Sequence, residues 1–125
     1  MEKHKFLYED LTDKIINLAI KVHKKLGPGF VEKVYEKALA YEFERNNLEF
    51  IRQKVIKVKY DDMCLGNQRI DFLIEDKVVV DLKAAVTIID LYIAQVLSYL
   101  KTMDRRVGLL LNFSRPTLQI KRVIN

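Results

Sequence analysis

The chain has 125 residues, half of them apolar, a formal net charge of +5 at pH 7 and a single cysteine, Cys64. This length and composition predict one domain, spanning residues 1–125, that folds without a disulfide or a structural metal. No apolar run reaches the roughly 18 residues that cross a bilayer, residues 1–5 are unlike a signal peptide, and one cysteine allows no internal disulfide, so we expect a cytoplasmic protein.

Two helices are expected at the start of the chain. Apolar residues recurring at helical spacing predict an amphipathic helix over residues 13–26, with Thr12 as its N-cap. The Gly-Pro-Gly run at residues 27–29 ends this helix, because glycine permits left-handed dihedrals and proline cannot continue the ladder of hydrogen bonds. A second helix is predicted over residues 31–46.

Strand character begins at residue 50. Residues 50–60 alternate apolar and basic side chains, so Ile56, Val58 and Tyr60 are expected on one buried face. Turn residues occur at 61–62 and again at 66–67.

Two apolar strands, residues 69–74 and 78–83, follow and are joined by a tight polar turn around Asp76. Their near-continuous apolar runs are typical of strands buried on both faces. If they pair as a hairpin about Asp76, Asp71 and Asp81 lie near each other across the ladder.

The last third of the chain predicts a helix over residues 90–102, a buried strand over 107–113 and an edge strand over 118–124. Leu91, Ala94, Leu97 and Leu100 form the expected core stripe of the helix. A helix between two strands usually crosses over the sheet and makes them parallel. The order of elements therefore predicts an α/β fold in which helices cover a mixed sheet.

Three ionisable residues, Asp71, Asp81 and Lys83, interrupt the two apolar strands. A charge inside such a strand is costly unless it is paired or binds a metal, and two close carboxylates repel unless a divalent cation lies between them. Asp81 and Lys83 are two residues apart, so both project from one face of their strand. The alternatives are a buried salt-bridge network or solvated charges on an edge strand.

Charge is also distributed unevenly along the chain. Residues 61–90 carry seven acidic and three basic side chains, whereas the segment from residue 91 carries six basic side chains and one acidic. An acidic centre beside a basic flank suits a metal-dependent enzyme that acts on a polyanion. Ordinary solvated charge is the simpler explanation, because basic small domains are common.

Four side chains on the predicted helices are further candidates. Glu32 lies in the first turn of the second helix, where the helix dipole alone favours a carboxylate, and Tyr35 lies one turn later. Gln95 and Tyr99 share a stripe of the third helix beside its leucines. A glutamine in that place is usually just exposed, but its neighbour Tyr99 indicates a polar surface that something covers.

These residues together resemble a known signature. Asp71 followed by Asp81-Leu82-Lys83 resembles the PD-(D/E)XK nuclease motif, and Gln95-x-x-x-Tyr99 resembles the motif of the branch typified by bacterial recombination exonucleases. Residues 29–35, with Gly29, Glu32 and Tyr35, read G-x-x-E-x-x-Y. The chain is similar, from about residue 11 to its end, to the small bacterial GxxExxY proteins of the PD-(D/E)XK superfamily.

The resemblance implies a restriction-endonuclease-like core, αβββαβ, with an extra N-terminal helix and a C-terminal edge strand. It also implies a Mg²⁺-dependent nuclease acting on DNA, with Mn²⁺ as a substitute metal. Glu32, Asp71 and Asp81 would hold the metal, Lys83 would hold the attacking water, and Gln95 would orient Lys83 or touch the substrate phosphate. Tyr35 and Tyr99 would have supporting roles.

For the nucleic acid, the resemblance makes Arg69, Lys101, Arg105 and Arg106 candidates for contacts with the phosphate backbone. A core this small often spans duplex DNA as a homodimer. The GxxExxY proteins usually carry Glu where this chain has Asp81, whose side chain is one methylene shorter. The alternative to an active nuclease is therefore a catalytically inactive module with the nuclease fold, which binds nucleic acid or a protein partner.

Overall fold

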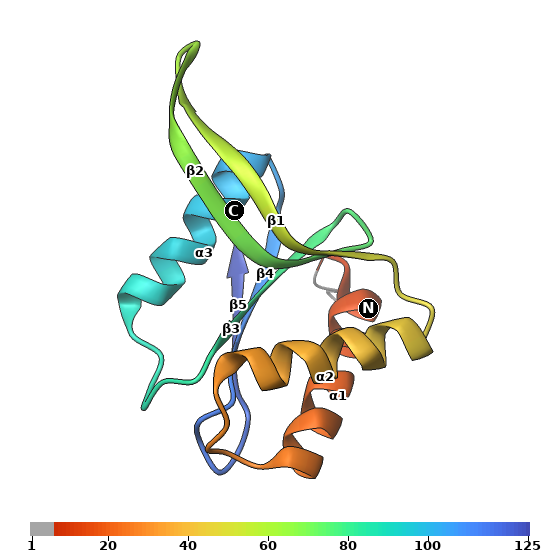
Figure 1. Ribbon diagram of the computed structural model, residues 1–125. Helices are drawn as coiled ribbons and strands as arrows, with labels where there is room; N and C mark the ends of the chain where they lie inside the picture. The colour runs from red at the N-terminus through yellow and green to blue at the C-terminus, as the bar shows by residue number, and fades with distance from the viewer. Residues whose placement is uncertain (1–6) are drawn as a thin grey trace, which may run out of the picture.

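The computed structural model describes residues 7–125, which form three helices and five strands (Figure 1). The elements are α1 (Glu9–Leu26), α2 (Glu32–Arg45), β1 (Phe50–Tyr60), β2 (Met63–Ile74), β3 (Val78–Lys83), α3 (Asp90–Met103), β4 (Val107–Asn112) and β5 (Gln119–Ile124). They occur in the predicted order, and no boundary of α2, β3, α3 or β4 differs from its prediction by more than one residue.

The five strands form one sheet in the order β1-β2-β3-β4-β5. Among the strands of residues 7–125, only β3 and β4 run parallel, and α3 is the connection between them. The other neighbours are antiparallel and are joined by short turns, which such pairs permit. The predicted mixed α/β fold with a C-terminal edge strand is confirmed.

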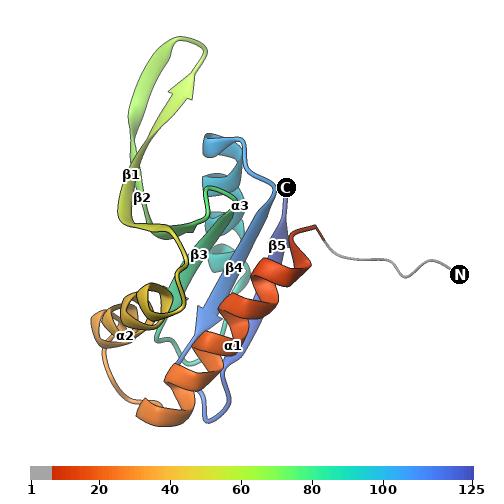
Figure 2. The same cartoon turned by 90° about the vertical axis from the view of Figure 1, so that its right-hand side faces the viewer.

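Helices cover both faces of the sheet, as Figure 2 shows from the side. Val78, Val80 and Leu82 of β3 pack in the core under α1 and α2, whereas Val79 packs in the core under α3. By the same alternation, Asp81 and Lys83 lie on the face that α3 covers. Every residue from the start of β3 through Leu82 is buried, so the predicted burial on both faces is confirmed.

The start of α1 differs from its prediction. The helix begins at Glu9, four residues early, and its N-cap is Tyr8 in a left-handed conformation. Thr12 is therefore not the N-cap. Its hydroxyl donates to the carbonyl of Glu9 at 3.1 Å and accepts from the Arg122 guanidinium at 2.8 Å, so tertiary contact with β5 extends the helix beyond the capping signal.

The predicted core stripe of α3 is confirmed at Leu100 and Leu97, which pack in the core, but it is wrong at Leu91. The buried residues are Val96, Tyr99 and Leu100, whereas Leu91 is 69% exposed. Apolar residues occur around most of this helix, so periodicity does not determine which side faces the sheet. No helix between residues 7 and 125 combines the length and apolar character that a membrane span requires.

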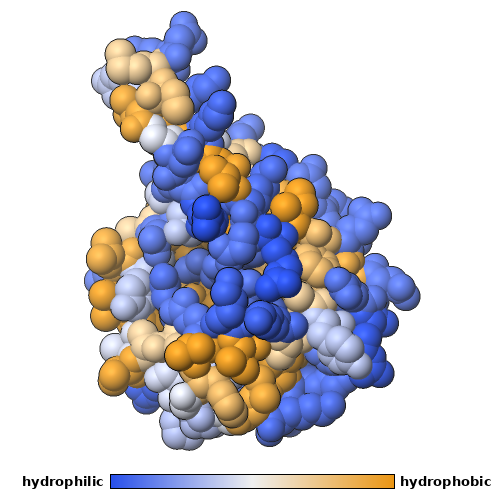
Figure 3. Space-filling model, viewed as in Figure 1, coloured by the Kyte–Doolittle hydropathy of each residue, from blue (hydrophilic) through white to orange (hydrophobic). Residues whose placement is uncertain are grey.

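The hairpin of β1 and β2 extends beyond the body of the protein (Figure 1), and we call its distal part, residues 57–67, the arm. Apolar and hydrophilic groups lie side by side on the surface of the arm (Figure 3). Tyr60 is 70% exposed, so the prediction that it faces the core is wrong. The reason is that β1 extends beyond the helices that would cover this residue. Gly66 and Asn67 lie within β2, and the turn is at Asp61 and Asp62 alone.

Gly108 on β4 lets α3 approach the sheet. A Cβ atom at this position would lie 2.7 Å from Val96 Cγ1, well inside van der Waals contact. We expect Gly108→Ala to destabilise the protein by about 1–3 kcal/mol in urea unfolding. Adding Val96→Ala removes the clashing methyl group, so the double variant should lose less stability than the sum of the two single variants. Full additivity would contradict this close contact.

Candidate active site

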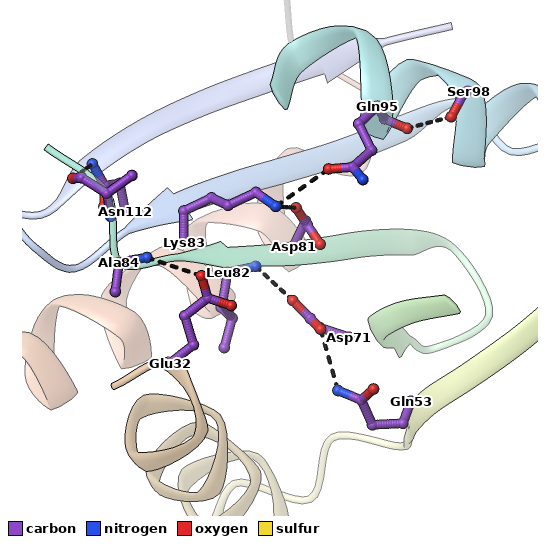
Figure 4. A network of polar contacts seen from close by, with 11 residues as sticks. Glu32, Gln53, Asp71, Asp81, Leu82, Lys83, Ala84, Gln95, Ser98 and Asn112 are labelled. Carbon is purple, nitrogen blue, oxygen red and sulfur yellow. Dashed lines mark hydrogen bonds and ion pairs between the residues drawn. The ribbon is translucent and has the colours of Figure 1, made fainter. Parts of the chain in front are cut away.

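The antiparallel register of β2 and β3 brings the two aspartates together. Phe72 pairs with Val80 and Ile74 with Val78, so the hairpin is centred on Asp76 as predicted, and Asp71 is level with Asp81. The ladder ends at Phe72, where β2 diverges from β3. Beyond this point Asp71 Oδ2 accepts a hydrogen bond from the Leu82 amide at 2.8 Å, which fixes the carboxylate against the end of β3 (Figure 4).

Asp81 is the strained member of this pair. Asp81 is 4% exposed, and its Oδ2 is buried without a hydrogen-bond partner among the described residues. Burial, and then the negative charge of Asp71, raise the pKa of Asp81 to about 7, while Lys83 acts in the opposite direction. The Lys83 ammonium lies 3.5 Å from Oδ2, within ion-pair distance but too far for a strong hydrogen bond.

Lys83 lies between the aspartates and α3 (Figure 4). Its Nζ donates to Gln95 Oε1 at 3.2 Å and lies 4.8 Å from the centroid of the Tyr92 ring. Gln95 thus holds the lysine from the helix side while Asp81 holds it from the strand side. The structure brings together Asp71, Asp81, Lys83 and Gln95.

Glu32 is the first residue of α2 and reaches the end of the same strand. Its Oε1 accepts from the Ala84 amide at 3.3 Å, directly after Lys83. Among the described residues, no group of three or more His, Cys, Asp or Glu side chains is placed to hold a metal ion. Glu32 is therefore at the border of the site rather than in one ligand cluster with the two aspartates.

Tyr35 supports Glu32 through the loop before α2. Its buried hydroxyl donates to the Gly27 carbonyl at 2.6 Å and accepts from the Phe30 amide at 3.2 Å, while its ring stacks on Phe113 at 4.5 Å. Gly29 between them has a φ of 111°, which side chains rarely adopt. The spacing G-x-x-E-x-x-Y thus has a mechanical reason, because the tyrosine anchors the turn that presents the glutamate.

Tyr99 lies behind the site on α3 and is buried. Burial raises its pKa to about 12, and the nearby charges of Asp81 and Asp71 act in the same direction. The hydroxyl therefore stays protonated at all working pH values. Its place beside both aspartates fits the supporting role that the resemblance implied.

Sequence reasoning missed Gln53, which holds Asp71 from the other side, and Glu36, which holds Gln53. Gln53 Nε2 donates to Asp71 Oδ1 at 3.2 Å and also to Glu36, which forms an ion pair with Arg52 at 2.7 Å. Glu36 is buried and shares the core-facing side of α2 with Leu39 and Phe43. A carboxylate at a core position of a helix is a signal that the sequence alone contains. Gln53 lies between two basic residues of a strand, and its position in the sequence contains no such signal.

Gln53 adopts a φ of 50° in the middle of β1, where it faces Asp71 but makes no ladder pair. Such left-handed conformations cost about 1 kcal/mol or more for a side-chain-bearing residue. We expect Gln53→Ala to release Asp71 and weaken Mn²⁺ binding about tenfold, measured by titration calorimetry. Gln53→Gly should lose binding equally but unfold about 1 kcal/mol less readily than Gln53→Ala. Unchanged binding in both variants would contradict the contact.

The four predicted phosphate-contacting residues are widely spread. Arg105 forms an ion pair with Asp76 at 2.7 Å, at the start of β3 and thus at the opposite end of this strand from Lys83. Arg106 donates to the Asn125 carbonyl at 3.0 Å in the same region. Arg69 is exposed on β2 two residues before Asp71, and Lys101 is exposed on α3.

The donor set around Asp71 and Asp81 suits a hard divalent cation. Two close carboxylates, one with a buried oxygen that accepts no hydrogen bond from the described residues, are ligands that Mg²⁺ prefers. The N–H and C=O groups of one strand residue point to the same side, so the Leu82 carbonyl faces the edge from which β2 has diverged. A cation here would offset the repulsion that raises the pKa of Asp81.

Comparison with known proteins agrees with this geometry. The family model described as PD-(D/E)XK nuclease superfamily matches residues 9–123. The crystal structure of SSO0001 is similar in fold, with a TM-score of 0.58 at 15% sequence identity, and the match covers 94% of this chain but 59% of that one. No curated protein sequence matches the chain. The chain belongs to the PD-(D/E)XK nuclease superfamily.

Proposed function

We propose that the protein is a nuclease that uses Mg²⁺, or Mn²⁺ in its place, to hydrolyse phosphodiester bonds in DNA. The observation that carries the proposal is the pair of Asp71 and Asp81, held side by side although burial and mutual repulsion disfavour their charged forms. Membership of the superfamily supports the same reaction class. A purely structural network would gain more from one neutral partner than from two carboxylates.

Each side chain then has a role that its position supports. Asp71 and Asp81 would bind the metal together with the Leu82 carbonyl, and Glu32 would contact it through water. The bound metal would supply activation of a water molecule and stabilisation of negative charge on the phosphate. Lys83 would hold the attacking water beside the phosphate, and Gln95 would keep the lysine ammonium in place.

We also infer that the chain is a GxxExxY protein, on the ground of Gly29, Glu32 and Tyr35 and the contacts that tie them together. Asp81 is one methylene shorter than the usual glutamate. It is compatible with activity if the hydrogen bond from the Leu82 amide to Asp71 draws β2 and β3 together and so offsets the shorter side chain. The single cysteine, Cys64, is free and exposed, which suits a reducing compartment, so we place the protein in the cytoplasm.

The test is cleavage of single-stranded, duplex and branched DNA by purified protein, with Mn²⁺, with Mg²⁺ and with EDTA. We expect cleavage only with a metal and its loss in Asp71→Ala. Asp62→Asn, a carboxylate at the tip of the arm, is the matched control and should cleave normally. Cleavage that survives Asp71→Ala would show that the activity belongs to a contaminant or to another site.

A further inference from the structure

A basic hollow lies where the arm passes the C-terminal half of α3. Its volume is about 500 Å³, and it is lined by Lys57, Val58 and Lys59 of β1 and by Lys101 and Thr102 of α3. Three of the five lining residues are lysines, and none is acidic. We define these five residues as the basic hollow.

The three lysines of the hollow have no neutralising partner within the part of the chain that the structure describes. Among residues 7–125, no ion pair or hydrogen bond involves the ammonium of Lys57, Lys59 or Lys101, whereas Lys21, Lys83 and Arg105 each face a carboxylate. The two acids of the arm, Asp61 and Asp62, are in its tip turn. Like charges gathered without counter-charges favour binding of a polyanion.

A polar stripe of α3 runs from the hollow to the candidate active site. Gln95, Ser98 and Thr102 follow one another at helical spacing, and Gln95 holds Lys83. Gln68 at the base of the arm donates to Ser98 Oγ at 2.9 Å and accepts from Thr102 Oγ1 at 2.9 Å. The arm is therefore fixed to the helix beside the basic hollow.

The spacing fits a nucleic-acid strand. Lys101 follows Gln95 by six residues, which is about 9 Å along a helix axis. Phosphates of one strand in a duplex are about 3.4 Å apart along its axis, so 9 Å corresponds to two or three nucleotides. A strand with its reacting phosphate beside Lys83 would have later phosphates beside the hollow.

We propose that the basic hollow binds the phosphate backbone of a DNA strand two or three nucleotides from the phosphate at Lys83. This assignment rests on the proposed function for the identity of the polyanion. It gives the arm a task, because Lys57 and Lys59 lie beyond the body and reach the strand only through the extended hairpin. It also assigns the main backbone contacts to Lys57, Lys59 and Lys101 rather than to Arg105 and Arg106, whose side chains have partners of their own.

The test measures binding without turnover. Fluorescence polarisation of a labelled 20-base-pair DNA duplex is followed in EDTA at several salt concentrations, for the whole chain and for the variant K57S/K59S/K101S. The slope of log K against log salt is negative, and each lost phosphate contact lowers its magnitude by about 0.9, so the magnitude should fall by roughly 2–3. At 0.1 M salt the affinity should fall at least tenfold.

The matched control is K24S/K25S/K121S, which removes the same charge from exposed lysines of α1 and β5. It should retain the wild-type salt slope, and both variants should keep the melting temperature of the parent. An unchanged slope in K57S/K59S/K101S, or an equal loss in the control, would overturn the assignment. A wild-type chain that does not bind the duplex in EDTA would overturn it as well. This experiment measures binding and not cleavage, so it can succeed even if the protein cleaves no DNA. A protein without nuclease activity whose salt slope changes only in K57S/K59S/K101S would contradict the nuclease proposal but not the binding site.

Discussion

Replacing Asp81 with asparagine is expected to stabilise the metal-free protein at pH 8 while abolishing its response to Mn²⁺ and its DNA cleavage. An amide has nearly the shape of the carboxylate but carries no charge, and its Nδ2 can donate to Asp71. The buried charge and the repulsion between the aspartates both disappear. The same change removes a metal ligand, so stability and function should move in opposite directions.

The pH dependence gives this prediction its sign. The pKa of Asp81 is about 7 in the folded protein against 3.8 for the ordinary group. Between these values the folded state binds more protons than the unfolded state, so the free energy of unfolding falls as the pH rises from about 4 to 7. Over this pH range the titration of Asp81 lowers the free energy of unfolding by roughly 4 kcal/mol. Asp81→Asn should remove this contribution and gain about 2 kcal/mol or more at pH 8.

Urea unfolding of both proteins at pH 5 and pH 8, with EDTA and with Mn²⁺, is the measurement. Wild-type protein should regain stability with Mn²⁺, by about 2.7 kcal/mol at a hundred times the dissociation constant. Asp81→Asn should not. If it instead destabilises the metal-free protein at pH 8, Asp81 is a member of a stabilising network.

Replacing Lys83 with methionine is expected to reduce cleavage by about 10²–10³-fold, because the side chain keeps its length but can no longer hold the attacking water. Mn²⁺ binding should persist, since both aspartates remain. Removing the ammonium takes away a group that lowers the pKa of Asp81, so any loss of stability should be confined to pH values above about 7.

Lys121→Met on the exposed strand β5 is the matched control and should cleave normally. The structural alternative, in which Lys83 stabilises the fold, predicts a large loss of stability at pH 6 as well. Asp81 is largely protonated at that pH, so the catalytic interpretation predicts little change. Strong destabilisation of Lys83→Met at pH 6 would thus contradict the role proposed for the lysine.

The sequence predicted the centre of the site because local chain geometry determines it. A tight turn at Asp76 fixes the register of β2 and β3, and that register alone makes Asp71 and Asp81 neighbours. The same holds for Glu32, which follows a loop anchored by Tyr35 within one short segment. These contacts span few residues and need little knowledge of the rest of the fold.

Contacts that depend on tertiary packing were not predictable in the same way. Gln53 reaches Asp71 only because β1 leaves the regular strand conformation at that residue. The side of α3 that faces the sheet depends on tertiary packing, in which Gly108 leaves room for Val96. Composition placed positive charge late in the chain, but it did not show that Arg105 would pair with Asp76 or that Lys57, Lys59 and Lys101 would line one hollow.

The most direct test of the metal site is a crystal structure of the protein soaked in Mn²⁺, with anomalous diffraction measured at the manganese edge. We predict a peak between the carboxylates of Asp71 and Asp81 and beside the Leu82 carbonyl, and its loss in Asp81→Asn. A map without a peak at this position, or with manganese bound only elsewhere, would contradict the proposed metal-dependent nuclease site.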